Sequence, residues 1–336
     1  MKMPMQIAFI GMLLFGWSVG FAESRTIKVA SDGTGDFQTI QEAVAAVRTN
    51  SPERAIIQIK AGTYTGPIIV PKDKMKVSFE GESAETTIIT YAFNLNDPIP
   101  QGSDRFNPGV QILGDEFRAS KITFENTSGN HGQALALRVD DDKSVFTNCR
   151  ITGWQDTLMI NNGRSYWKDC FISGRVDFIY GSGTAFFDHC EIQSRNGGHI
   201  TAASTPQDHP FGYVFNNCKL TADPTPWSWP ATNPTSQPVT DKPTPIADLG
   251  RPWRPYASVT YLNCEMGAHI LPAGWNNWRN AENEKTARYA EYNSTGPGAN
   301  PEKRFKWTKQ LSKDEAGSIT ITKVLAGSDN WNPLEE

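Results

Sequence analysis

Two aspartates at equivalent positions of a sequence repeat are the residues of this chain best suited to chemistry. Asp156 lies seven residues after Cys149, and Asp177 lies seven residues after Cys170. If the two repeats stack, the carboxylates become neighbours, and their repulsion keeps one protonated and the other ionised near neutral pH. An ionised carboxylate can attack a carbonyl carbon, and a protonated one can donate a proton to a leaving group. The pair is therefore suited to acyl transfer.

Two glutamines accompany the aspartates. Gln155 lies six residues after Cys149, and Gln133 lies six residues after Thr127, which takes the place of Cys in a degenerate earlier repeat. Amide N–H groups at these positions can hold the oxyanion that develops when a carbonyl is attacked. The alternative interpretation is that these polar rows only bond to one another where the chain bends.

The elements that position these residues follow from the repeat. Five segments read aromatic, any residue, Asn/Asp/His, Cys, any residue, aliphatic, and they contain Cys149, Cys170, Cys190, Cys218 and Cys264. Counted from Thr127, the successive spacings are 22, 21, 20, 28 and 46 residues, and such a period predicts a solenoid. Because the segments between are short and β-like, we expect an all-β fold, a right-handed parallel β-helix with coils about 4.8 Å apart. Inward-facing Cys, Ile and Phe are expected to form ladders along its core.

Two segments are expected to depart from regular coils. Thr39 and Glu42 form a capping box, and the apolar residues Ile40, Ala43 and Val44 share one helical face. This pattern predicts a short N-terminal helix that closes the open end of the solenoid. Residues 222–248 carry seven prolines, and strand ladders do not tolerate so many missing N–H donors. The second segment is therefore expected to be a loop on the solenoid wall.

Residues 1–22 have the pattern of a secretory signal peptide, with Lys2, an apolar stretch over residues 7–19, and Ala22 before the cleavage site. Residues 23–336 are then expected to form one domain, secreted to the cell wall and without a membrane anchor. Lys and Arg number 32 against 36 Asp and Glu, a net charge of −4. No basic cluster indicates a nucleic-acid partner.

Four segments closely resemble the signature segments of the pectin methylesterases, or pectinesterases. They are Gln133-Ala-Leu-Ala-Leu137, Gly153-Trp-Gln-Asp-Thr-Leu158, Asp177-Phe-Ile-Tyr-Gly181 and Leu249-Gly-Arg-Pro-Trp253. The resemblance extends from about residue 27 to Trp331-Asn-Pro333. It implies hydrolysis of the C6 methyl esters of homogalacturonan (pectin), with release of methanol. It also implies the right-handed parallel β-helix and the absence of any metal or organic cofactor.

The resemblance also implies a role for each chemical residue. The family's nucleophile matches Asp177 and its general acid and base matches Asp156, in agreement with the pair found from the repeat. Its oxyanion donors match Gln133 and Gln155. The arginine that binds the nucleophile matches Arg251, and the aromatic residue that lines the sugar site matches Trp253. Tyr180, three residues after the nucleophile, either faces the substrate or packs in the core. Four further tryptophans are expected to pack in surface loops, the alternative being that they stack on sugars: Trp227, Trp229, Trp275 and Trp278.

Two other classes of protein stay open at this stage. A pectin lyase or a polygalacturonase would share the solenoid and the substrate, but neither needs the paired glutamines. A solenoid that only binds carbohydrate is the third interpretation, which the intact set of chemical residues disfavours. We expect a monomer in each case.

The odd number of cysteines, five, leaves at least one thiol unpaired. Export permits a disulfide. Some bacterial relatives bridge positions that match Cys170 and Cys190, one coil apart, so this pair is preferred. The alternative is a ladder of buried, reduced cysteines that behave as small apolar residues.

Overall fold

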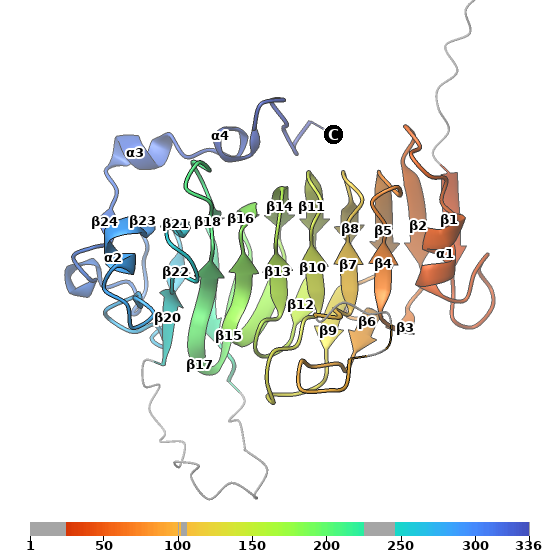
Figure 1. Ribbon diagram of the computed structural model, residues 1–336, viewed down its shortest axis with the longest axis horizontal. Helices are drawn as coiled ribbons and strands as arrows, with labels where there is room; N and C mark the ends of the chain where they lie inside the picture. Colours follow the sequence, from red (N-terminus) through yellow and green to blue (C-terminus); the bar gives the residue numbers. More distant parts are fainter. Residues whose placement is uncertain (1–24, 100, 102–105, 225–245, 336) are drawn as a thin grey trace, which may run out of the picture.

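Short runs of β-branched and aromatic residues, separated by Gly, Asn and Asp, give this chain short strands that stack coil upon coil (Figure 1). The computed structural model describes residues 25–99, 101, 106–224 and 246–335. All strand pairs between the named strands of these residues are parallel. The parallel β-helix expected from the repeat is thus confirmed.

The strands form two sheets, and the second sheet folds around a corner. Sheet A has eleven strands, in the order β1 (Arg25–Val29), β2 (Ala55–Ile59), β5 (Val77–Gly81), β8 (Arg118–Ser120), β11 (Ser144–Thr147), β14 (Arg164–Lys168), β16 (Thr184–Asp188), β18 (Tyr213–Asn216), β21 (Ser258–Leu262), β23 (Arg288–Tyr292) and β24 (Lys309–Gln310). Sheet B has thirteen strands in two rows. One row holds β3 (Gly62–Thr65), β6 (Thr87–Tyr91), β9 (Thr123–Asn126), β12 (Arg150–Thr152), β19 (Lys219–Ala222) and β22 (Glu265–Met266), and the other holds β4 (Ile68–Val70), β7 (Val110–Ile112), β10 (Leu137–Val139), β13 (Leu158–Ile160) and β20 (Ala247–Gly250). The long strands β15 (Phe171–Gly181) and β17 (Glu191–Ala203) run through both rows, so the coils have three walls.

The core is held by ladders of like side chains. The aromatic position of the repeat stacks in register along sheet A, from Phe146 through Trp167, Phe187 and Phe215 to Tyr261. The ring centroids of successive members lie 3.9, 5.8, 4.5 and 4.6 Å apart. Because parallel in-register strands repeat every coil, one sequence pattern produces a continuous stack of buried rings.

The polar position before each cysteine has a backbone explanation. These residues have φ between 52° and 54°, in the left-handed region, and they are Asn148, Asp169, His189, Asn217 and Asn263. Asn, Asp and His enter this region more readily than other residues that carry a Cβ. The bend between sheet A and sheet B therefore selects them, and it turns the following cysteine inward.

The cysteines correct one of the expectations. All five are free and buried, so the predicted Cys170–Cys190 disulfide is wrong. The Cys170 thiol donates to the main-chain oxygen of Phe146 at 3.5 Å, and the Cys190 thiol donates to that of Trp167 at 3.5 Å. Each sulfur is thus directed at a carbonyl of the preceding coil. Burial raises the pKa of both thiols well above the usual range, which keeps them protonated and unreactive.

Short helices lie at the two ends of the chain. The predicted helix is confirmed as α1 (Ile40–Ala46), with Thr39 as N-cap, the capping box formed, and the apolar face buried against the first strands. Near the other end, α2 (Asn283–Thr286) directly precedes β23. A 3₁₀ turn (Pro301–Lys303), α3 (Lys313–Gly317) and α4 (Ile321–Leu325) follow β23. Leu325 and Trp331 pack with Tyr166 and Phe186 on the outer face of sheet A.

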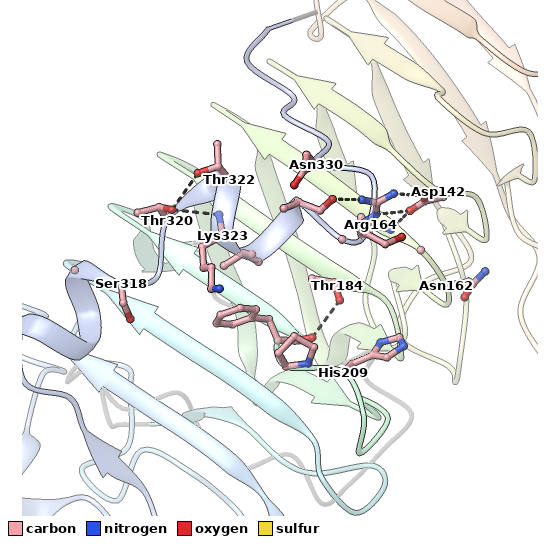
Figure 2. Close-up of a pocket in the computed structure, with 18 residues that line it drawn as sticks. Asp142, Asn162, Arg164, Thr184, His209, Ser318, Thr320, Thr322, Lys323 and Asn330 are labelled. Carbon is pink, nitrogen blue, oxygen red and sulfur yellow. Dashed lines mark hydrogen bonds and ion pairs between the residues drawn. The ribbon is translucent and has the colours of Figure 1, made fainter.

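A cavity of about 1300 Å³ lies beside α4 (Figure 2). It is lined by the C-terminal segment, by the first residues of β14 and β16 (Arg164 and Thr184), and by the loop that contains His209. None of the candidate catalytic or sugar-binding residues lines it, so this cavity is not where the chemistry is expected. No helix among the described residues is long and apolar enough to cross a membrane. The predicted signal peptide, Trp227, Trp229 and most of the proline-rich segment lie outside the described residues.

Candidate active site

Asp156 and Asp177 are neighbours on adjacent coils. Leu158 of β13 lies opposite Ile179 of β15, and the same register two residues earlier places the two aspartates side by side. The amide N–H of Asp156 donates to the carbonyl of Val176 at 3.0 Å, which fixes this alignment. The equal offsets in the sequence therefore predicted the proximity correctly.

The backbone at both aspartates turns. Asp156 has φ of 60° and Asp177 has φ of 51°, in the left-handed region. Aspartate enters this region more readily than most residues that carry a Cβ, as it does at the bends between the sheets. After Asp177 the inward–outward alternation of a strand fails, because the consecutive residues Phe178 and Ile179 both lie in the core. At this kink the Asp177 carboxylate lies on the outer surface of the strand, and the two residues after it hold the strand in the core.

Asp177 is held by Arg251. The guanidinium donates from Nε to Oδ1 at 2.8 Å and from Nη2 to Oδ2 at 2.6 Å. Arg251 follows β20, and its own N–H donates to Thr201 of β17 at 2.9 Å. The Asp177 side chain is 9% exposed and that of Arg251 is 21% exposed, so the pair is little screened by water. A bidentate pair of this kind fixes the orientation of the carboxylate.

Asp156 lies in the opposite kind of environment. Its residue is 4% exposed, and one carboxylate oxygen accepts a hydrogen bond from Gln133 Nε2 at 2.8 Å. Burial and then the charge of Asp177 raise the pKa of Asp156 to about 7, against hydrogen bonds from Gln133 and Gln155 that lower it. Near neutral pH much of Asp156 is therefore protonated while its neighbour is paired with a cation.

The two glutamines are also paired with each other in the fold. Gln133 and Gln155 form a parallel bridge between adjacent coils, and Ala134 N–H donates to the Gln155 carbonyl at 3.0 Å. The two amide side chains thus lie next to the two carboxylates, and Gln133 contacts Asp156 directly. The structure brings together all five residues expected to do the chemistry: Gln133, Gln155, Asp156, Asp177 and Arg251.

An apolar cluster on the outer face of sheet B flanks these polar groups. It consists of Leu135, Met159, Tyr180 and Ala202, with Leu95, Phe106, Trp253 and Trp278 packed against them. The rings of Tyr180 and Trp253 meet edge to face with centroids 5.9 Å apart. Tyr180 is only 4% exposed, and burial raises the pKa of its hydroxyl well above the usual range. Tyr180 therefore supports Trp253 from below, and Trp253 is the half-buried ring at the surface.

Trp275 and Trp278, both expected to pack in surface loops, have different places, and the expectation is wrong for Trp275. Trp275 is 2% exposed and donates from its indole N–H to Glu291 at 2.9 Å, so it belongs to the core. Trp278 lies flat against Arg251, whose guanidinium carbon is 3.7 Å from the ring centroid. Sequence reasoning gave Trp278 no such role, since no local pattern shows that it reaches a residue 27 positions earlier. Among the described residues, no group of three or more His, Cys, Asp or Glu side chains is arranged to hold a metal ion.

Comparison with known proteins agrees with this geometry. The model of the Pectinesterase family matches residues 26–328. Pectinesterase 31 of Arabidopsis thaliana is 39% identical over 306 residues, which cover 88% of this chain and 90% of the relative. A pectinesterase/pectinesterase inhibitor of Brassica campestris is 37% identical over 312 residues, and there the chain spans about half of the relative's length (52%).

Solved structures show the same arrangement of the chain. The pectin methylesterase from carrot superposes with a TM-score of 0.80 at 34% identity, over 91% of this chain and 94% of that one. A pectin methylesterase solved in complex with a hexasaccharide superposes with a TM-score of 0.76 at 27% identity, over 93% of this chain and 99% of that one.

Proposed function

This chain belongs to the pectinesterase family, and from that premise we propose that it removes methyl groups from pectin with Asp177 as nucleophile and Asp156 as general acid and base. The family places it among the carboxylic ester hydrolases. The observation that carries the assignment of roles is the contrast between the two adjacent carboxylates. Arg251 pairs with both oxygens of Asp177, whereas burial beside that charge raises the pKa of Asp156 to about 7.

In the first half of the reaction, an ionised oxygen of Asp177 attacks the carbonyl carbon of a C6 methyl ester. The carbonyl oxygen becomes an oxyanion, and amide N–H groups of Gln133 and Gln155 stabilise it. Protonated Asp156 gives its proton to the methoxy oxygen as the C–O bond breaks, so methanol leaves. The galacturonyl group is then joined to Asp177 as an acyl-enzyme anhydride.

In the second half, Asp156 is ionised and takes a proton from water. The water oxygen attacks the galacturonyl carbon, and Asp177 leaves as a carboxylate. Each oxygen of Asp177 has two lone pairs, so it can attack while it accepts a bond from Arg251. The product leaves as a galacturonic acid, which releases its proton to solvent, and the enzyme is left with protonated Asp156 and ionised Asp177, its starting state.

The proposed substrate is methyl-esterified homogalacturonan, bound with sugar faces against Trp253. A half-buried ring beside the two carboxylates, supported from below by Tyr180, suits the apolar face of a pyranose. We propose further that residues 23–336 act as one secreted, monomeric domain after removal of residues 1–22. The apolar stretch of the N-terminal sequence supports the secretion.

The experiment that tests this function measures methanol released by the purified protein from highly methylated pectin. We expect methanol to appear without any fall in the chain length of the polymer and without new unsaturated ends. Chain shortening would indicate a polygalacturonase, and unsaturated ends would indicate a lyase. Binding without methanol release would indicate a carbohydrate-binding solenoid.

A further inference from the structure

A histidine–aspartate pair lies next to the nucleophile and has no part in the reaction described above. His199 Nδ1 lies 2.9 Å from Oδ1 and 2.7 Å from Oδ2 of Asp248. The Asp248 side chain is 4% exposed and that of His199 is 20% exposed. A buried carboxylate thus holds an imidazole whose outer part reaches the surface.

The register of sheet B fixes where this pair lies. His199 of β17 is opposite Val176 of β15 on one side and Asp248 of β20 on the other. Val176 directly precedes the nucleophile, and neighbouring strands in a sheet are about 4.8 Å apart. Asp248 lies three residues before Arg251, which holds that nucleophile. The pair therefore occupies the next two coils beyond Asp177, in the same row of sheet B.

The charges of the pair favour an imidazole that donates hydrogen bonds. Burial raises the pKa of Asp248, and the bond and charge of His199 oppose that rise. An imidazole that donates from Nδ1 to a carboxylate is fixed in orientation, and when both of its nitrogens carry a proton the outer one donates to a second acceptor. Among the described residues the His199 ring is hydrogen-bonded only through Nδ1, which leaves Nε2 for a ligand.

We propose that His199, oriented by Asp248, binds the carboxylate of a galacturonate residue next to the ester under attack. The inference rests on the proposed function, since each turnover on pectin leaves a carboxylate on the polymer. The protein carries a net charge of −4, so an anionic sugar has to be recognised by local donors. Arg251 beside it is already engaged by Asp177 and covered by Trp278. The subsite would make an ester beside an already demethylated sugar a better substrate than one within a fully methylated run.

Binding of unesterified hexagalacturonate, measured by calorimetry, tests the subsite without any turnover. A hydrogen bond to a charged group is strong enough that His199→Gln should raise Kd at least about tenfold. Asp248→Asn leaves the imidazole in place but removes the charge that holds it, so it should also weaken binding. His189→Asn is the matched control, because His189 also contacts an aspartate, Asp188, but lies at the bend from sheet A with its side chain 57% exposed.

Kinetics distinguish a subsite from a structural role. In His199→Gln, kcat/KM for partly demethylated pectin should fall about tenfold more than kcat/KM for fully methylated pectin. An equal fall for both substrates, or unchanged hexagalacturonate binding in the folded variants, would overturn the proposal. If His199→Gln does not fold, Asp248→Asn decides the question. Methanol release by the unchanged protein tests the proposed function separately, so either idea can fail alone.

Discussion

Arg251 grips Asp177 through two parallel hydrogen bonds, of 2.8 and 2.6 Å, although the two residues are 74 positions apart in the sequence. The contact spans neighbouring strands of sheet B, from the end of β20 across β17 to the kink in β15. The two adjacent carboxylates therefore have different environments. Asp177 is paired with the Arg251 cation, whereas burial and the charge of Asp177 raise the pKa of Asp156. The predictions below test this division of roles.

Asp177→Asn should reduce methanol release by about 10⁴-fold or more, because a carboxamide of the same shape cannot form the acyl-enzyme. The variant should fold, since Asn is also tolerated in the left-handed region. Methanol release from methylated pectin and far-ultraviolet circular dichroism check both points. Asp188→Asn, a buried aspartate on sheet A, should keep its activity. A folded Asp177→Asn protein with ordinary activity would remove Asp177 as nucleophile.

Asp156→Asn should lower activity by about 10²–10⁴-fold, the usual contribution of a general acid or base. In the unchanged protein, kcat/KM should fall as pH rises through about 7, because Asp156 then loses the proton that methanol needs. This alkaline fall should disappear from the residual activity of the variant. A pH profile of both proteins makes the comparison. Asp141→Asn, a buried aspartate in the turn after β10, should keep the alkaline fall.

The same titration should be visible in stability. The pKa of Asp156 is raised from 3.8 to about 7 on folding, so the native state binds a proton that the unfolded state has lost between these pH values. This contribution to the free energy of unfolding is complete below pH 3.8 and is lost as pH rises through about 7. Asp156→Asn has no proton to lose at this position. The free energy of unfolding of the variant minus that of the unchanged protein should therefore rise by about 3 kcal/mol from pH 5 to pH 8. Urea unfolding at both pH values measures it, and a constant difference would contradict the raised pKa.

Arg251→Lys should lower kcat about 10- to 100-fold with little change in Tm. Lysine keeps a positive charge but cannot make two parallel bonds to Asp177, and each charge-assisted bond contributes about 1.5–3 kcal/mol. Arg150→Lys is a suitable control, because Arg150 also lies over an aromatic ring, Phe171, but in the other row of sheet B. Wild-type turnover in Arg251→Lys would exclude this arginine from the site.

Trp278→Leu should lower kcat about 3- to 30-fold, the range expected when a partly buried cation–π contact is lost. In the Arg251→Lys background the same change should have little further effect, because the two residues act through one contact. Phe305→Leu, an exposed ring that stacks on Trp307, serves as the control. Additive losses in the double variant would show that Trp278 acts independently of Arg251.

The cysteines should behave as five buried thiols. In denaturant and without reductant, alkylation should modify all five, whereas the native protein should react slowly. A reductant should leave Tm unchanged, because no cross-link restrains the unfolded chain. Recovery of only three alkylated thiols would restore the Cys170–Cys190 disulfide.

Much of the fold and of the carboxylate pair was predictable from sequence because a solenoid converts offsets along the chain into neighbours in space. Asp156 and Asp177 share an offset from their cysteines, and parallel in-register pairing then places them side by side. The N-terminal helix was predictable for a related reason, since a capping box acts within four residues. In both cases the information that decides the structure is local or strictly periodic.

Other features depended on contacts that no period encodes. Arg251 lies within the irregular spacing of 46 residues between Cys218 and Cys264, so only the resemblance to a family, not the repeat, linked it to Asp177. The contact of Trp278 with Arg251 and the pairing of His199 with Asp248 are visible only in the folded chain, where separate strands and turns come together.

The sequence by itself determined the coil period, the residues at the bends and which carboxylates share a row, because backbone geometry and strand register act at short range. The tertiary structure decided that the pKa of Asp156 is raised, because burial and the neighbouring Asp177 disfavour its charged form, and that Arg251 pairs with Asp177. It also decided that Cys170 and Cys190 stay unbridged. Stacked coils bring the cysteines near one another, but the side-chain direction at each bend turns the sulfurs toward main-chain carbonyls.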